Sequence, residues 1–209
     1  MKFKYYFRKS SFKKDIRSAD ILLDQIDLYK PKNFLEVGVF QGVTSKNVCE
    51  KLYLLHKNDF KYYGVDIFED TNRDIDIKES TIKHSKISNP FKHLWFNLIL
   101  KEDLNSIKSV AKLLKKFDCN VELIKGFSHE ALKKIDLTKI EFIFLDGGHA
   151  YETVKNDLRI ILKDIKKNMV IICDDYDQEG YGVKKAVDEL RSHVTDIVNL
   201  NGRLVKIIA

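Results

Sequence analysis

The sequence of 209 residues predicts an open α/β sheet that is mostly parallel and carries one antiparallel strand. Three observations lead to this fold class. Short apolar runs alternate with longer segments of helical periodicity along most of the chain. The first apolar run stops at a glycine, as expected of a buried strand that turns into a helix. Near the C-terminus, two β-rich runs flank Asn201-Gly202, the dipeptide most typical of a hairpin.

The expected elements follow one another in the order that βαβ units with right-handed crossovers require. Apolar residues at helical spacing predict helices at 18–29, 44–56, 101–117, 150–166 and 181–193. Short apolar or β-rich runs predict strands at 33–39, 60–67, 121–124, 140–146, 168–173, 195–200 and 203–208. Residues 70–100 exceed what a crossover needs, so we interpret this insertion as a substrate lid or, alternatively, a structural excursion.

We expect two parts: a basic N-terminal arm of residues 1–17 and a single domain of residues 18–209. The chain has 37 Lys and Arg against 31 Asp and Glu, and residues 1–14 hold six basic residues and no acid. The rest of the chain is therefore neutral, which disfavours nucleic-acid binding. The aromatic-rich arm is expected to pack on the domain or to be mobile, and contact with an anionic membrane or an acidic partner is the alternative.

The sequence contains few features that indicate a cellular location. No apolar run is long enough to cross a bilayer, and the basic N-terminus lacks the continuous apolar segment of a secretory signal. Cys49, Cys119 and Cys173 lie far apart, which disfavours a disulfide framework or a zinc site. A cytoplasmic protein without a transmembrane segment is the expectation, and the sequence leaves the oligomeric state open, a homo-oligomer included.

A cofactor site is expected where strands end, because ligands of open α/β sheets bind beyond the carboxyl ends of the strands. Glycines allow a tight turn after the first strand, and the following helix N-terminus can face an anion. A carboxylate after the second strand can accept both ribose hydroxyls, and the loop after the third can border adenine. The G-x-x-x-G spacing disfavours NAD and favours S-adenosylmethionine (SAM). The candidate residues are Glu36, Gly38, Gly42, Thr44, Asp66, Gly126, Phe127 and Ser128.

Two further strand ends carry carboxylates. Asp146 follows the 140–146 strand, and Asp174 and Asp175 follow the 168–173 strand. If these strands are neighbours, the three carboxylates converge and repel one another unless a cation lies among them. A hard divalent ion such as Mg²⁺ prefers such oxygen ligands. His149, three residues beyond Asp146, is the candidate general base, and Asp146 is assigned to the catalytic set with it.

These residues give the chain a family resemblance. The chain resembles class I SAM-dependent methyltransferases, and the matching segments are FLEVGVFQGVT, YGVD, IEFIFLDGGHAYETVKNDL, VIICDDYD and GVKKAVDEL. More narrowly, the chain resembles the group of macrocin-type and mycinamicin-type sugar O-methyltransferases and cephalosporin-hydroxylase-like proteins. The likeness covers most of residues 33–208, without the arm and the insertion. It implies a Rossmann-like fold, with a mostly parallel seven-stranded sheet and a C-terminal antiparallel hairpin.

The resemblance also implies a chemistry. It predicts Mg²⁺ at the three aspartates, His149 as base, and SAM-dependent methyl transfer to a hydroxyl of a sugar or another small molecule. Alternatives remain open: another acceptor, such as a catechol, a small acid or RNA, or a non-catalytic SAM-binding relative or partner protein. The Asp-x-x-His element disfavours a pure binder, because binding alone needs no base. An NAD-linked oxidoreductase is disfavoured by the glycine spacing.

Overall fold

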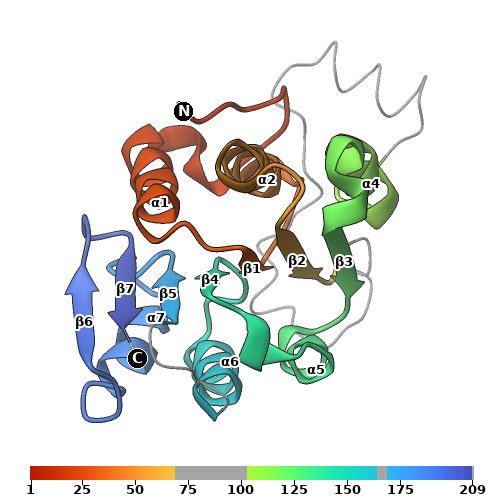
Figure 1. The fold of residues 1–209 in the computed structure, drawn as a ribbon. Helices are drawn as coiled ribbons and strands as arrows, with labels where there is room; N and C mark the ends of the chain where they lie inside the picture. The colour runs from red at the N-terminus through yellow and green to blue at the C-terminus, as the bar shows by residue number, and fades with distance from the viewer. Residues whose placement is uncertain (69–102, 164–168, 209) are drawn as a thin grey trace.

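A seven-stranded sheet forms the centre of the computed structural model, which describes residues 1–68, 103–163 and 169–208 (Figure 1). Its strands are β1 (Asn33–Val37), β2 (Lys61–Asp66), β3 (Val121–Lys125), β4 (Phe142–Leu145), β5 (Val170–Cys173), β6 (Asp196–Asn199) and β7 (Val205–Ile208). The α-helices are α1 (Ile16–Tyr29), α2 (Val43–His56), α4 (Ile107–Leu114), α5 (Ser128–Ala131), α6 (Tyr151–Lys163) and α7 (Val183–Asp188).

The strand order is β3-β2-β1-β4-β5-β7-β6. Strands β1 to β5 pair in parallel, whereas β7 runs antiparallel to both β5 and β6. The predicted α/β sheet with a C-terminal antiparallel pair is therefore confirmed. The strand order changes direction between β1 and β4, and open α/β sheets bind ligands beyond the strand ends at such a switch point.

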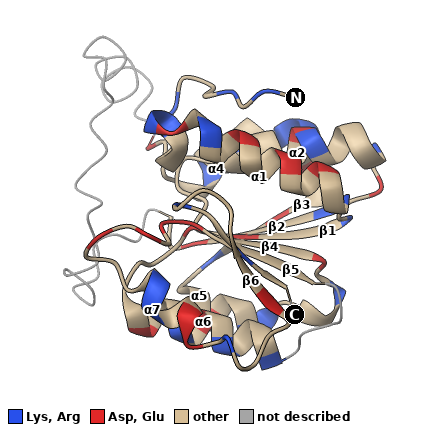
Figure 2. Ribbon diagram, turned by 90° about the vertical axis from the view of Figure 1, so that its left-hand side faces the viewer, with Lys and Arg blue, Asp and Glu red and all other residues tan. Residues whose placement is uncertain are grey.

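Helices cover both faces of the sheet. Helices α1, α2 and α4 lie on one face and α5, α6 and α7 on the other (Figure 2). Each face has its own apolar core: Phe34, Phe142 and Phe144 point into one, and Leu35, Ile143 and Ile171 into the other. Because the central strands are buried on both sides, they appear in the sequence as continuous apolar runs instead of alternating ones.

Two helices are shorter than the sequence predicts, and three short helices were not predicted. The helix expected at 101–117 begins only at Ile107, after the Ser106 cap, and gives way to the 3₁₀ helix η3 (Lys115–Asn120). The helix expected at 181–193 spans only Val183–Asp188, and turns closed by hydrogen bonds between residues three positions apart follow it. The short helices between β3 and β4 were not predicted; they are α5 and two 3₁₀ turns, η4 (Leu132–Lys134) and η5 (Leu137–Lys139).

The C-terminal hairpin has a longer connection than the Asn-Gly signal suggested. Residues 200–204 form it, closed by a hydrogen bond from the Leu200 N–H to the Leu204 carbonyl (2.9 Å). The side-chain oxygens of Asn199 and Asn201 accept hydrogen bonds from the backbone N–H groups of Gly202 and Leu204. Asparagine side chains thus support the wider loop, and Arg203 lies in it instead of in a strand.

The N-terminal arm packs on the domain through residues 1–15. Phe12, in the 3₁₀ helix η1 (Ser11–Lys14), is fully buried and stacks on Phe144 of β4 with ring centroids 5.9 Å apart. Asn47 of α2 binds the Lys4 backbone in both directions, accepting from its N–H and donating to its carbonyl. Aromatic burial and backbone pairing therefore hold this basic segment against the domain.

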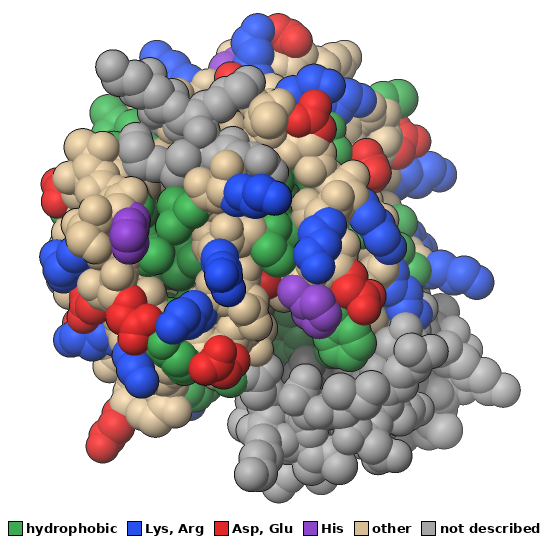
Figure 3. Space-filling view, turned by 90° about the horizontal axis from the view of Figure 1, so that it is seen from below, with side chains coloured by type: hydrophobic (Ala, Val, Ile, Leu, Met, Phe, Trp, Pro, Cys, Tyr) green, Lys and Arg blue, Asp and Glu red, His purple; other side chains and the backbone are tan. Residues whose placement is uncertain are grey.

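Charged side chains of both signs lie on the surface of the domain. On the face shown in Figure 3, Lys and Arg are interspersed with Asp and Glu. Within the described ranges, no helix combines the length and the apolarity needed to cross a membrane. The insertion expected at 70–100 lies entirely within residues 69–102, outside the described part of the chain, so the proposed lid stays a prediction.

Candidate active site

Hydrogen bonds align the carboxyl ends of the central strands. The Gly38 N–H donates to the Val65 carbonyl (2.9 Å), the Asp146 N–H to the Val37 carbonyl (2.8 Å), and the Asp174 N–H to the Leu145 carbonyl (2.9 Å). The parallel ladder thus continues past the strands, and the loops after β1, β2, β4 and β5 meet at one edge of the sheet. The sequence-predicted site residues come from these loops, the strand ends that lead into them, and the loop after β3.

The glycine loop after β1 touches the loop after β4. Gly38 has φ +95°, and a Cβ placed on it would lie 2.0 Å from the Asp146 carbonyl oxygen. Only glycine permits both the backbone conformation and this approach. Gly42 (φ +73°) precedes α2, whose first turn has no side-chain cap, so its N–H groups are available to an anion. Thr44 is buried in that first turn.

Glu36 lies on β1, behind the glycine loop. Its carboxyl group is fully buried and accepts a hydrogen bond from the Tyr62 hydroxyl (2.6 Å). Burial raises the pKa of Glu36 to about 8, although the Tyr62 hydrogen bond acts in the opposite direction. The Glu36 carboxyl group is therefore a buried partner of the Tyr62 hydroxyl and is neutral over much of the physiological range.

Replacing Glu36 with Gln is expected to change how stability depends on pH. The folded-state pKa of Glu36 lies above its usual 4.5, so the folded chain binds more protons than the unfolded chain between about pH 4.5 and pH 8. Its contribution to stability is fully present below this window and is lost as pH rises through it. Glu36→Gln keeps a neutral hydrogen-bonding group and removes this loss.

Chemical denaturation of both proteins at pH 5, 7 and 9 measures the effect. We expect the free energy of unfolding of Glu36→Gln relative to the unmodified chain to rise by roughly 2–4 kcal/mol from pH 5 to pH 9. Parallel stability curves over this range would show that Glu36 does not titrate in this way.

Asp66 ends β2, as the sequence predicted for a ribose-binding carboxylate. One of its oxygens accepts the backbone N–H groups of Val39 and Phe40, each at 2.7 Å, and the other accepts the Phe68 N–H at 2.8 Å. The carboxylate thus fixes the glycine loop. Of the roughly four acceptor positions of a carboxylate, three are thus used, and the remaining one, on the oxygen that accepts the Phe68 N–H, is compatible with a contact to one ribose hydroxyl.

Gly126 borders open space beside Asp66. Its N–H donates to the Asp66 carbonyl (2.9 Å), its φ is +154°, and a Cβ on it would meet nothing within 4 Å. Phe127 stacks on His129 with ring centroids 5.9 Å apart, and Ser128 begins α5. An aromatic residue and an open glycine therefore lie where the adenine edge was expected.

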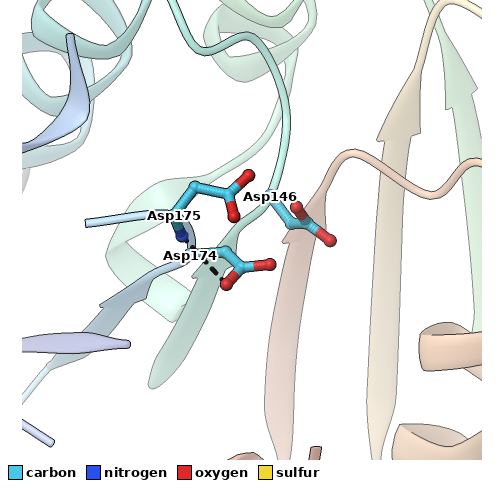
Figure 4. Close-up of side chains that lie close together, drawn as sticks. All are labelled: Asp146, Asp174 and Asp175. Atoms are coloured by element: carbon cyan, nitrogen blue, oxygen red, sulfur yellow. Dashed lines mark hydrogen bonds between the residues drawn. The ribbon is translucent and has the colours of Figure 1, made fainter. Parts of the chain in front are cut away.

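Three carboxylates converge after β4 and β5. One oxygen each of Asp146, Asp174 and Asp175 lies within 4.8 Å of the others, and Figure 4 shows the three groups around a common space. Burial and the charge of Asp174 raise the pKa of Asp146 and of Asp175. Asp175 has φ +57°, a strained conformation of the kind that concentrates at functional sites. The sequence-predicted convergence is present.

His149 lies beside this acidic cluster. Its Nδ1 is 3.5 Å from Asp175 Oδ2, and its ring stacks on Tyr181 at 4.4 Å between centroids with an interplanar angle of 3°. The Gly182 N–H donates to the His149 carbonyl (2.8 Å) and fixes the backbone of this loop. An aromatic ring and a carboxylate therefore orient the imidazole, a pattern suited to proton transfer.

Arg203 was not among the sequence-predicted site residues. Its Nε and Nη2 donate to the two oxygens of Asp174 at 2.6 and 2.5 Å, and its Nε is 3.7 Å from Asp175. Antiparallel β7 pairs with β5 so that Cys173 faces Val205. The residues just before β7 therefore lie at the same edge as the residues just after β5, which is the signal that could have found Arg203.

The arm also reaches the site. The Ser11 hydroxyl donates to Asp146 (2.8 Å). The Arg8 guanidinium donates to the Gln41 carbonyl of the glycine loop (3.1 Å) and to Ser109 of α4. Composition alone marked the arm as a charged tail, whereas these contacts make it part of the site.

Comparisons with known proteins agree with this arrangement. Residues 35–176, more than half of the chain, match the model of a family described as a methyltransferase domain. The chain belongs to this methyltransferase family. The assignment to class I methyltransferases, and with it the assignment as an enzyme, is confirmed. No curated protein sequence matches the chain.

Solved structures share the fold of this methyltransferase at low sequence identity. The O-methyltransferase NovP has a TM-score of 0.63 and 16% identity, covering 91% of this chain and 77% of that one. The calicheamicin methyltransferase CalS11 has a TM-score of 0.61 and 19% identity, with 93% and 78% covered. An O-methyltransferase from Bacillus cereus in complex with SAH has a TM-score of 0.61 and 13% identity, with 98% and 84% covered.

The candidate residues of the methyltransferase fall into two groups. Most lie at the carboxyl edge of the sheet, where Gly38, Asp66, Asp146 and His149 border neighbouring loops. Glu36, on β1, and Thr44, in the first turn of α2, are buried. Most of the predicted residues therefore lie at the carboxyl edge of the sheet, but the sequence did not distinguish them from the buried Glu36 and Thr44.

Proposed function

We propose that the chain is a SAM-dependent, Mg²⁺-dependent O-methyltransferase that acts on a hydroxyl of a sugar or another small molecule. The observation that carries the proposal is the contact between the glycine loop and the Asp146 loop at Gly38. A cofactor held at the glycine loop would lie next to the acidic cluster and His149. Methyl donor, acceptor and base would then share one edge of the sheet.

The residues present fit both groups. For SAM, the uncapped N-terminus of α2 faces the glycine loop, and Gly126 borders open space. For Mg²⁺, three carboxylates supply hard oxygen donors within 4.8 Å of one another. Oxygens bound to one Mg²⁺ lie at most about 4.2 Å apart, so the three side chains would have to move closer together, and Asp174 would have to give up a hydrogen bond from Arg203. Mg²⁺ would be held by Asp146, Asp174 and Asp175, and it would there supply a Lewis acid that lowers the pKa of the acceptor hydroxyl.

The chain's own residues would do the rest of the chemistry. His149 would accept the hydroxyl proton at Nε2, since its Nδ1 faces Asp175. Asp175 would stabilise the imidazolium that results, and Tyr181 would hold the ring plane. The acceptor oxygen would take the methyl group from the sulfonium sulfur of SAM, which would leave as the thioether S-adenosylhomocysteine, while the acceptor's proton would pass to His149. NovP, described as an O-methyltransferase, and CalS11, described as a TDP-rhamnose 3'-O-methyltransferase, support this choice of acceptor atom.

Calorimetric titration with S-adenosylhomocysteine (SAH), with and without Mg²⁺, tests the cofactor. We expect micromolar binding of SAH and no binding of NAD, since the loop lacks the dinucleotide spacing. Absence of SAH binding under both conditions would contradict the proposal, and binding of NAD alone would favour an oxidoreductase. A positive result turns the search for the acceptor into a screen of hydroxyl compounds.

A further inference from the structure

A guanidinium already lies in the acidic cluster that we propose as the metal site. Arg203 binds both oxygens of Asp174 in a bidentate pair, and its Nε is 3.7 Å from Asp175 Oδ1. Asp174 is only 2% exposed, and one of its oxygens also accepts the Asp175 N–H (2.9 Å). Both oxygens of this carboxylate are thus engaged, although it is the middle member of the proposed ligand set.

The N-terminal arm holds Arg203 from behind. The Arg203 guanidinium lies 4.7 Å over the ring of the buried Phe12, its Nη1 donates to the Ser11 carbonyl (3.2 Å), and Asp15 is 4.0 Å away. The Ser11 hydroxyl meanwhile donates to Asp146. Arm, arginine and carboxylates therefore form one connected group, in which protein donors satisfy oxygens that a metal would otherwise use.

A divalent ion and this guanidinium repel each other at such short range. Both are cations, and both need the oxygens of Asp174. A buried carboxylate left without a cation is costly, so one of the two partners must neutralise it. Metal binding at Asp174 therefore requires Arg203 to release at least one of the two oxygens.

We propose that Arg203 is the internal counter-ion of the metal-free site and competes with the divalent ion for Asp174. The inference rests on the proposed function, because it takes the three aspartates as the metal ligands. Arg203, held by Phe12 and Ser11, thereby sets the metal affinity of the enzyme. It also keeps the cluster folded when no metal is bound.

Calorimetric titration of the full chain with Mn²⁺ and with Mg²⁺ tests this role. Arg203→Met removes the charge but keeps an apolar stem over Phe12, and we expect it to bind the metal at least about tenfold more tightly than the unmodified chain. Arg203→Lys keeps a charge without the bidentate fork, so its affinity should fall between the two. Arg191→Met, an exposed arginine paired with Asp188, is the matched control and should leave metal affinity unchanged.

Thermal melting gives a second readout. Without metal, Arg203→Met should melt at a lower temperature than the unmodified chain, and added Mn²⁺ should raise its melting temperature more. If Arg203→Met does not fold, the affinity of Arg203→Lys decides the question. If Arg203→Met or Arg203→Lys binds the metal no more tightly than the unmodified chain does, Arg203 does not compete with the metal for Asp174, although the metal site itself is still supported. Absence of metal binding in all variants would overturn the metal site as well, whereas SAH titration tests the methyltransferase proposal separately.

Discussion

His149→Ala is expected to reduce turnover by roughly 10²–10⁴-fold, the range lost with a general base. The reason is geometric: Asp175 and Tyr181 hold the imidazole at the edge where donor and acceptor would meet. Asp175 and Tyr181 are the contacts of the imidazole ring identified in the described part of the chain, and neither belongs to the glycine loop, so the Kd for SAH should stay within about threefold of its original value. SAH formation with the first hydroxyl acceptor found by screening gives the rate, and calorimetry gives the Kd.

A matched control separates loss of the base from general damage. His193→Ala removes an exposed histidine in the turns after α7 and should leave both values unchanged. Added imidazole should restore part of the rate of His149→Ala and none in any variant that is merely misfolded. Full turnover of His149→Ala across pH would show that another group, or water, takes the proton.

The sequence predicted the edge of the sheet well because strand ends are local features. Apolar runs that stop at Gly38, Asp66, Asp146 and Asp174 mark the ends of four strands that are buried on both faces. Parallel strands place these ends side by side, so convergence of the three aspartates followed from neighbouring strands alone. His149 followed from its distance of three residues from Asp146.

The place of Arg203 in the site could not be predicted from the local sequence pattern. The hairpin signal places β6 and β7 together but does not state which of them pairs with β5. In the structure it is β7, the later strand, and this order brings the hairpin loop to the acidic cluster. The wider loop of residues 200–204 then frees Arg203 from the strand. The order of the strands and the geometry of the loop thus bring the Arg203 guanidinium to the aspartates, and the periodicity of the sequence encodes neither of them.

The N-terminal arm is a second feature that the composition of the sequence could not predict. A count of charges describes Arg8 as part of a basic tail, but its guanidinium binds backbone carbonyls of the glycine loop and of Ser109. Phe12 was one of several aromatic residues in that tail, and it is a fully buried core residue next to Phe144. Side-chain burial is a property of the folded chain, so charge and hydropathy along the arm could not distinguish packing from mobility.

Gly38→Ala is expected to cause the largest loss of stability among single substitutions at the site. The backbone at φ +95° strains any side chain, at a cost on the order of 1–3 kcal/mol. The added Cβ would also lie 2.0 Å from the Asp146 carbonyl oxygen and 2.4 Å from its carbon. Both atoms belong to backbone, which cannot rotate away, so the loops after β1 and β4 must separate. SAH binding should be lost along with the fixed geometry of the glycine loop.

Gly180→Ala is the control that isolates backbone strain from collision. Gly180 has a similar φ of +82°, but a Cβ there would meet nothing within 4 Å. Chemical denaturation should therefore show a loss of about 1 kcal/mol for Gly180→Ala and a loss at least about 2 kcal/mol larger for Gly38→Ala. Equal losses would mean that the Asp146 loop moves aside without cost, and the contact between the two loops could then no longer support the proposal that methyl donor, acceptor and base share one edge of the sheet.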